Sequence, residues 1–325
     1  MRRALPAALR LAVALGLTAY VLWRSDPAAA LGALRTVDWR FIAAAAALVL
    51  IDRALMAYRW LVLLRPLPSA SGVPFRAVLR VFFISTFVGT FLPASVGGDA
   101  VRSVALARHA VPLTDVVASV LLDRVFGILG ILLVGAVALA AVPAAVPVWL
   151  PPVTIALAAA ASLALAVTLL SAPAQRLAAR AVGWLPFAHL RGVGANLLEA
   201  LRAYRQAPGA LANVLAGSVG VQLMRVWQAW LLGLSVGIAL GPVPYLVYVP
   251  VILLVMLLPI TINGLGTSQA AFVYLFARSG VVQSDAFALS VLFVALGIVG
   301  NLPGAALYVA GGIGGPRGRV ASSAG

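Results

Sequence analysis

Long runs of hydrophobic residues, separated by short polar segments, occupy most of the chain. A helix that crosses a bilayer needs about 20 predominantly apolar residues, and most of the runs approach or exceed that length. Seven runs lie at 41–64, 78–93, 116–141, 153–170, 211–235, 245–262 and 286–310, and a shorter helical segment is expected at 268–277. The pattern predicts an all-α, polytopic membrane helix bundle that forms a single integral membrane domain over residues 1–325.

The N-terminus carries a further apolar stretch at 11–23, which follows Arg2, Arg3 and Arg10. This arrangement resembles a cleavable signal peptide, and Ala28-Ala29-Ala30 has the small residues of a cleavage site. Because seven more apolar runs follow, we interpret the stretch as an uncleaved first membrane span.

The composition supports a membrane protein and excludes other classes. Of 325 residues, 63% are hydrophobic and only 10% are charged, and the mean hydropathy is +1.09. Soluble domains carry about a quarter charged residues, so soluble globular, disordered and coiled-coil proteins are excluded. The absence of cysteine excludes a disulfide framework and thiolate chemistry. With two His and one Glu, few ligands remain for zinc, and we expect no metal and no cofactor.

The net charge of +15 comes from 23 basic residues, all of them Arg. A basic balance of this size can indicate nucleic-acid binding. Here, however, most Arg residues lie in short segments between apolar runs, where membrane orientation and anionic lipid headgroups explain them better. We therefore expect membrane lipid as the partner, with anionic headgroups at the cytoplasmic face and no nucleic acid.

Two parts of the chain share an order of motifs. Each has Leu-Pro, then a glycine-rich segment, then an Arg and an Asp seven residues apart. The first copy comprises Leu92-Pro93, Gly97-Gly98-Asp99, Arg108 and Asp115, and the second Leu258-Pro259, Asn263-Gly264-Leu265-Gly266, Arg278 and Asp285. The offset is 166 at the prolines and 170 at the Arg and Asp pairs, as a four-residue insertion would produce. Chance similarity of apolar sequence is the alternative; we interpret the pattern as a repeat of about 41–141 in about 209–311.

The Arg distribution predicts how the repeats cross the membrane. If 78–111 and 245–278 are re-entrant hairpins, about six full spans remain and both termini are cytoplasmic. The Arg-rich polar insertion 172–208 is then also cytoplasmic, as the positive-inside rule requires, and we expect a helix along the interface there. A full crossing by the first hairpin would place this insertion outside. Three full spans separate the hairpins, so they enter from opposite faces and form an inverted repeat, as in many transporters.

Broken backbone at membrane depth is tolerated only where protein or a wet cavity surrounds it. Six residues are predicted to shape the hairpin tips, because they accept unusual dihedral angles, close approach or helix ends. They are Pro93, Gly97, Gly98, Pro259, Gly264 and Gly266.

Three ordered motifs carry a family resemblance: FLPASVGGDAVR at 91–102, LLDRVFG at 121–127 and LPITINGLG at 258–266. They resemble the lysylphosphatidylglycerol synthase transmembrane family of flippase-like integral membrane proteins, over about residues 40–310. The resemblance implies a lipid or lipid-linked substrate that is translocated across the bilayer. Two departures stand out: Ser268-Gln269 replaces the Arg-Glu pair of many members, and Asp123 stands where Glu is common. The first puts charge coupling through the second hairpin in doubt.

Charged residues inside the spans point to a binding site, because each costs about 2.5–3.5 kcal/mol at the membrane centre. Asp52 and Arg53 lie in one run, and internal pairing that only satisfies buried charge is the simpler explanation for them. Arg59 is expected to extend toward the cytoplasmic interface. Arg residues exceed Asp residues by two at membrane depth, which an anionic ligand would compensate.

We therefore predict that Arg102, Arg124 and Arg225 hold a lipid phosphate, since the planar guanidinium binds two oxygens at once. Asp99 and Asp123 would orient these Arg residues or bind a cationic headgroup. Asn263 and Gln269 are further substrate-binding candidates, although Asn263 is equally suited to capping freed backbone groups.

These features predict flippase-like translocation of an anionic phospholipid or a polyprenyl-phosphate-linked lipid, in the cell inner membrane. Two alternatives remain. In the first, the chain is a non-transporting subunit of a lipid-modifying enzyme, with a separate synthase or glycosyltransferase as partner. In the second, the chain is itself a membrane enzyme. A membrane enzyme would need a base, nucleophile or metal cluster, for which Asp99 and Asp123 alone are thin support, and we expect no enzymatic activity. Because Lys is absent, there is no P-loop, which leaves downhill exchange or ion coupling.

Overall fold

The fold was obtained as a computed structural model, which describes residues 15–16, 18–91, 97–108, 111–142, 147, 149–184, 188–257 and 264–311. Within these ranges the regular structure is helical and no strand occurs. The helices are α2 (Pro27–Arg35), α3 (Trp39–Leu64), α4 (Phe75–Thr90), α5 (Gly97–Ala107), α6 (Leu113–Ala141), α7 (Leu150–Leu170), α8 (Ala172–Gly183), α9 (Ala188–Arg205), α10 (Pro208–Ser235), α11 (Pro242–Leu257), α12 (Thr267–Ala277), α13 (Gln283–Val299) and α14 (Leu302–Gly311).

Five helical segments are long and apolar enough to cross a membrane. They are Trp39–Leu64, Leu113–Ala141, Leu150–Val167, Pro208–Ser235 and Gln283–Val309, the last formed by α13 and α14 together. They coincide with five of the six predicted full spans and confirm a polytopic helical membrane protein. Of the remaining predicted span, 11–23, residues 15–16 and 18–23 are helical and residues 11–14 and 17 lie outside the described residues.

Short polar signals fix where several of these helices begin. The Asp26 carboxylate accepts hydrogen bonds from the backbone N–H groups of Ala28 and Ala29, at 3.1 and 3.2 Å, at the start of α2. Asp38 caps α3 by accepting from the N–H of Arg40 at 2.9 Å. Such side-chain caps satisfy backbone donors that the first helical turn leaves without partners.

The two halves of the chain have matching helix lengths. Helices α3, α4, α5 and α6 contain 26, 16, 11 and 29 residues. Their counterparts α10, α11 and α12 contain 28, 16 and 11 residues, and the segment formed by α13 and α14 contains 27. These lengths agree with the repeat interpreted from the sequence motifs, which stays a prediction.

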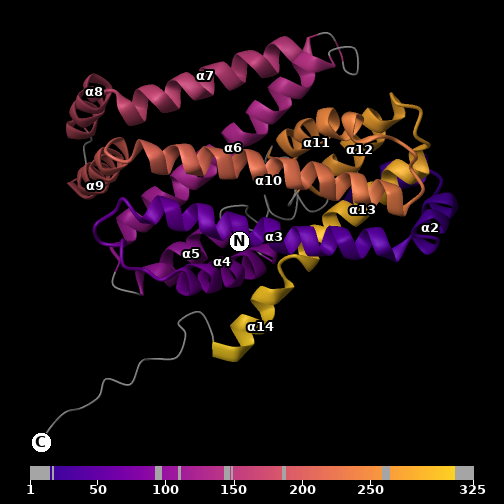
Figure 1. Ribbon diagram of the computed structural model, residues 1–325, viewed down its shortest axis with the longest axis horizontal. Helices are drawn as coiled ribbons and strands as arrows, with labels where there is room; N and C mark the ends of the chain where they lie inside the picture. The colour runs from indigo at the N-terminus through magenta and orange to yellow at the C-terminus, as the bar shows by residue number, and fades with distance from the viewer. Residues whose placement is uncertain are drawn as a thin grey trace, which may run out of the picture.

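The corresponding helices α3 and α10 pack antiparallel. The Asp38 N–H at the start of α3 donates to the Ser235 carbonyl at the end of α10, at 2.9 Å. Further along α3, Arg59 Nη1 donates to Ser218 Oγ at 3.0 Å. The short helix pairs lie at opposite ends of the bundle, with α4 and α5 toward α8 and α9, and α11 and α12 at the far end (Figure 1).

Each short helix pair packs on the other half of the molecule. Helix α4 lies against α14, where a Cβ at Gly304 would come within 2.0 Å of the Phe83 carbonyl oxygen. Helix α11 lies against α6, where Gly135 faces Pro250. These exchanged contacts bind the halves into one bundle.

The polar insertion 172–208 folds as α8 and α9, which lie together at one end of the bundle (Figure 1). The Tyr204 hydroxyl donates to the Leu63 carbonyl oxygen at 2.9 Å and fastens α9 to the end of α3. Burial raises the pKa of the Tyr204 phenol, so this donor keeps its proton. The prediction of helix in the insertion is confirmed; its place along a membrane interface stays a prediction.

Glycines act differently in the two short helix pairs. Gly98 lies in the first turn of α5 against Gly89 of α4, and a Cβ at Gly89 would come within 2.9 Å of the Gly98 Cα. Gly264 and Gly266 instead have φ of +75° and +84°, a region that L side chains rarely adopt. The first pair therefore needs its glycine for close helix packing and the second for backbone conformation. Pro93 and Pro259, predicted for the same tips, lie outside the described residues.

Candidate functional site

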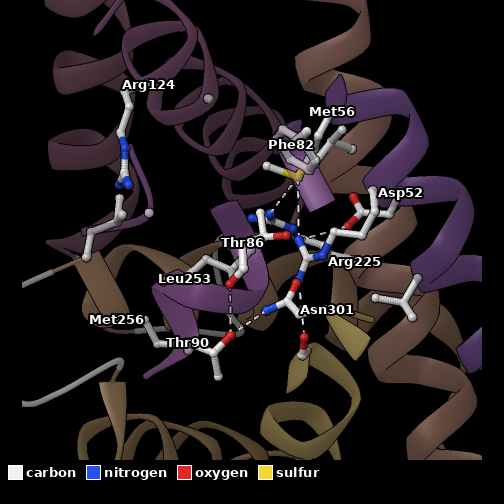
Figure 2. A pocket seen from close by; sticks show the side chains of 18 of the residues that line it. Asp52, Met56, Phe82, Thr86, Thr90, Arg124, Arg225, Leu253, Met256 and Asn301 are labelled. Carbon is white, nitrogen blue, oxygen red and sulfur yellow. Dashed lines mark hydrogen bonds and ion pairs between the residues drawn. The ribbon is translucent and has the colours of Figure 1, made fainter. Parts of the chain in front are cut away.

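A cavity of about 620 Å³ lies between the two halves of the bundle. Its walls come from α3, α4, α5 and α6 of the first half and from α10, α11 and α13 of the second, together with Asn301 at the start of α14 (Figure 2). Apolar side chains such as Phe82, Leu253 and Phe293 form part of the wall. The volume is within the range of about 300–1,000 Å³ that is typical of small-ligand sites.

The cavity wall carries an excess of positive charge. Its described charged residues are five arginines, Arg53, Arg59, Arg102, Arg124 and Arg225, and three aspartates, Asp52, Asp99 and Asp123. The formal excess is therefore two positive charges, the same value that the sequence predicted for membrane depth. The way in which these residues pair divides them into two groups.

Asp123 of α6 is the centre of the first group. Its Oδ1 accepts from Arg59 Nε at 2.8 Å, and its Oδ2 accepts from Arg102 Nη1 at 3.1 Å. All three side chains are 5% exposed or less. Buried charges are stable only when they are paired and hydrogen-bonded, and Asp123 supplies that partner to two helices, α3 and α5.

Asp99 of α5 extends this network toward the cavity. Its Oδ1 pairs with Arg102 Nη2 at 3.1 Å, and its Oδ2 pairs with Arg124 Nε. The Arg102 guanidinium also lies 5.1 Å from the ring centroid of Trp60, a distance at which cation–π attraction operates. Arg102 is thus held by two carboxylates and an aromatic ring, whereas the Arg124 side chain is 40% exposed.

The network corrects one expectation. Arg59 was expected to extend toward the cytoplasmic interface, and that prediction is wrong. Its side chain is 3% exposed, pairs with Asp123 and donates to Ser218 Oγ. The Asp123 carboxylate and the Ser218 hydroxyl satisfy the Arg59 guanidinium inside the bundle, so the side chain does not need to extend to water.

The second group surrounds Arg225 of α10. Arg53 pairs with Asp52 at 3.5 Å and reaches the Gly297 carbonyl at 3.5 Å, in agreement with the simple pairing considered for these two residues. Arg225 Nη2 lies 3.6 Å from the Met56 sulfur. No described carboxylate forms an ion pair with Arg225. In Figure 2, Arg124 is well separated from the labelled side chains around Arg225.

Three neutral amides on the cavity wall were missed by the sequence analysis. They are Gln222 and Gln228 of α10 and Asn301. Asn301 Nδ2 donates to Thr90 Oγ1 at 2.9 Å and links the end of α4 to the start of α14 (Figure 2). A signal was present on α10, because Ser218, Gln222, Arg225 and Gln228 recur every three or four residues in an apolar run. Only the charged member of that stripe was singled out.

The other predicted ligand in the second half lies elsewhere. Gln269 is buried in the first turn of α12 and does not line the cavity. Its Oε1 accepts from the Gly266 N–H at 2.6 Å and from Ser268 Oγ at 3.1 Å. It therefore satisfies the free backbone donor of the glycine-rich tip. Asn263 lies outside the described residues.

The acidic and histidine side chains of the described ranges form no group of three or more that could hold a metal ion. What the site offers is cationic side chains and amides in a partly apolar cavity. That combination suits an amphipathic anion, with phosphate near the arginines and hydrocarbon along the apolar wall.

Comparison with known proteins gives one finding. The family model described as the lysylphosphatidylglycerol synthase TM region matches residues 7–304. No curated protein matches the chain. The matched range includes every charged residue of the cavity wall.

Proposed function

The chain belongs to the lysylphosphatidylglycerol synthase transmembrane-region family, and from that premise we propose that it moves an anionic phospholipid or a polyprenyl-phosphate-linked lipid across the membrane. The family places the protein among membrane proteins involved in lipid handling. Translocation is the further step that we propose here.

The observation that carries the proposal is the uncompensated charge of the cavity. Five arginines face three aspartates, and an arginine at membrane depth is costly without a counter-charge. Arg225, which has no described carboxylate partner, is the side chain best suited to receive a phosphate, with Arg124 as the exposed cation on the other side. Guanidinium groups bind phosphate oxygens in pairs, so a lipid phosphate in the cavity would neutralise the excess.

The arrangement of the halves supports a route for the lipid. We propose that α4–α5 and α11–α12 are re-entrant hairpins that enter the membrane from opposite faces and form an inverted repeat. The antiparallel pairing of α3 with α10 and the opposite placement of the short pairs support this proposal (Figure 1). Transporters with inverted repeats expose a central site to one face and then the other by moving the halves against each other.

Charge supports an orientation for this arrangement. The end of the bundle that holds α8 and α9 carries Arg65, Arg76, Arg108, Arg176, Arg180, Arg202 and Arg205. The other end has fewer Arg residues, and Asp26, Asp38 and Asp285 offset them. Positive residues favour the cytoplasmic side, so we propose that α8, α9 and both chain termini are cytoplasmic.

The test is lipid movement in vesicles that contain only the purified protein. Acyl-labelled fluorescent phosphatidylglycerol is placed in both leaflets. An external quencher that does not cross the membrane reaches the outer-leaflet probe at once and the inner-leaflet probe only as that probe crosses. We expect the full chain to expose the inner-leaflet fraction and Arg225→Gln to slow this at least about tenfold, which corresponds to the loss of about 1.4 kcal/mol of phosphate binding. Arg108→Gln, at an exposed position at the end of α5, is the matched control and should retain the rate.

Equal accessibility in protein-containing and empty vesicles, for phosphatidylglycerol and for a polyprenyl phosphate probe, would overturn the proposal. It would favour a non-transporting subunit of a lipid-modifying enzyme.

A further inference from the structure

The cavity wall carries a second set of polar groups that phosphate binding does not use. The residues Gln222 and Gln228 are 2% and 3% exposed, and both line the cavity together with Asn301. These amides are uncharged and lie beside Arg225, which is three residues from each glutamine along α10. A helix rises about 1.5 Å per residue, so each glutamine lies about 4.5 Å along the axis from Arg225.

Several polar atoms of these amides and of the cavity-lining pair Asp52 and Arg53 are buried without a hydrogen-bond partner. In the part of the chain that the structure describes, they are the acceptors Gln222 Oε1, Asn301 Oδ1 and Asp52 Oδ1 and the donors Gln228 Nε2 and Arg53 Nε. Buried polar groups in proteins nearly always have partners, and leaving them unpaired is unfavourable. The side chains that carry these five atoms all line the same cavity, so a ligand with both donors and acceptors would complete them there.

Resting on the proposed function, we propose that these groups form the headgroup subsite, and that the lipid carries an uncharged, hydroxyl-rich headgroup, a polyol or sugar, on its phosphate. A hydroxyl both donates and accepts hydrogen bonds, so a headgroup with several hydroxyls matches a wall of mixed donors and acceptors. With the phosphate at Arg225, the first hydroxyls beyond it would lie within one helical turn, where the two glutamines are.

The same geometry disfavours a cationic headgroup, which was one of the roles considered for Asp99 and Asp123. An ammonium group offers only donors, so it would leave the buried donors Gln228 Nε2 and Arg53 Nε without a partner. Asp123 is engaged by Arg59 and Arg102, and Asp99 is engaged by Arg102 and Arg124. Asp52 pairs with Arg53 through Oδ2, which leaves Asp52 Oδ1 as one acceptor of the cavity. An amine in the cavity would face an excess of arginines.

The experiment compares headgroups in the vesicle assay. The probes are acyl-labelled phosphatidylglycerol and phosphatidylinositol, which carry hydroxyls, and phosphatidic acid and phosphatidylserine, which are anionic without a polyol. A fluorescent polyprenyl phosphosugar forms a separate arm that distinguishes a phospholipid from a polyprenyl-linked source of the same chemistry. We expect the best hydroxyl-bearing probe to move at least about tenfold faster than phosphatidic acid, because a site built for hydroxyls discriminates against ligands that lack them.

The variant Gln222→Leu/Gln228→Leu should remove this preference. Its rate for the hydroxyl-bearing probe should fall to that for phosphatidic acid, while the phosphatidic acid rate stays within about twofold of the unsubstituted protein, because Arg225 is retained. Gln283→Leu, at an exposed position at the start of α13, is the matched control and should keep the preference.

The failures of the two proposals are distinguishable. If phosphatidic acid and phosphatidylserine move as fast as every hydroxyl-bearing probe, the headgroup inference is overturned and translocation stands. A double variant that slows all probes equally also overturns it. If no probe moves with the unsubstituted protein, the proposed function fails and the inference fails with it.

Discussion

Asp123 organises the buried charges of this protein at the scale of single residues. It is the one carboxylate among the described residues that pairs with arginines from two other helices, Arg59 on α3 and Arg102 on α5. Arg102 in turn shares Asp99 with Arg124. The network therefore fixes α5 of the first short helix pair against the long helices α3 and α6, whereas Arg225 of α10 has no described carboxylate partner.

Replacing Asp123 with Asn should destabilise the protein strongly. The change leaves two buried arginines with one fewer carboxylate, and removing one partner of a buried ion pair costs about 3–5 kcal/mol. Thermal unfolding of the purified protein in detergent should show a markedly lower midpoint. Asp123→Glu keeps the charge and should recover much of the loss, and Asp115→Asn, near the start of the same helix, should have little effect. A midpoint unchanged by Asp123→Asn would contradict the central role of this carboxylate.

At the scale of helices, glycine determines how closely the short pairs approach their neighbours. Gly98 packs on Gly89 within the α4–α5 pair, and Gly304 of α14 packs on the backbone of α4. Small residues are the usual means of close helix packing in membranes, where apolar surface alone gives little drive for association. The contact of α4 with α14 therefore joins the first short pair to the last helix of the second half.

Gly304→Ala should loosen this contact. The added Cβ would lie 2.0 Å from the Phe83 carbonyl oxygen and 2.7 Å from the Phe87 Cβ, so α14 must shift away from α4. Overpacking of this kind costs about 1–3 kcal/mol, and the detergent unfolding midpoint should fall accordingly. Gly32→Ala in α2, where nothing lies within 4 Å of the new Cβ, is the control and should be neutral or slightly stabilising. Equal midpoints for both variants would refute the close contact.

At the scale of the whole molecule, the sequence predicted what depends on local pattern. Run length and hydropathy located five spans, and the helix lengths of the two halves agree with the predicted motif repeat. The sequence also located the charged residues of the cavity, because charged residues stand out in apolar runs. It did not predict that Arg59 would meet Asp123, since 64 residues separate them and only packing brings them together. Gln222 and Gln228 were missed because a neutral amide carries a weak signal until its burial is known.

The absence of cysteine makes the membrane arrangement of the whole molecule directly testable. Single substitutions Ser71→Cys and Arg108→Cys flank the α4–α5 pair, and Gly241→Cys and Gln283→Cys flank α11–α12. If both pairs are re-entrant, the first two cysteines share the cytoplasmic side and the last two share the opposite side. A membrane-impermeant maleimide applied to intact cells should therefore label the last two at once, and the first two only after permeabilisation.

The cysteine-free parent chain is the background control for this labelling, and each variant must retain lipid movement in vesicles. Labelling of positions 71 and 108 from opposite sides would mean that α4–α5 crosses the membrane fully. Helices α8 and α9, with their arginines, would then lie on the other side from the loop at 71, against the positive-inside bias. Because an inverted repeat requires the two pairs to enter from opposite faces, that single result would also remove the structural basis for alternating access around the cavity.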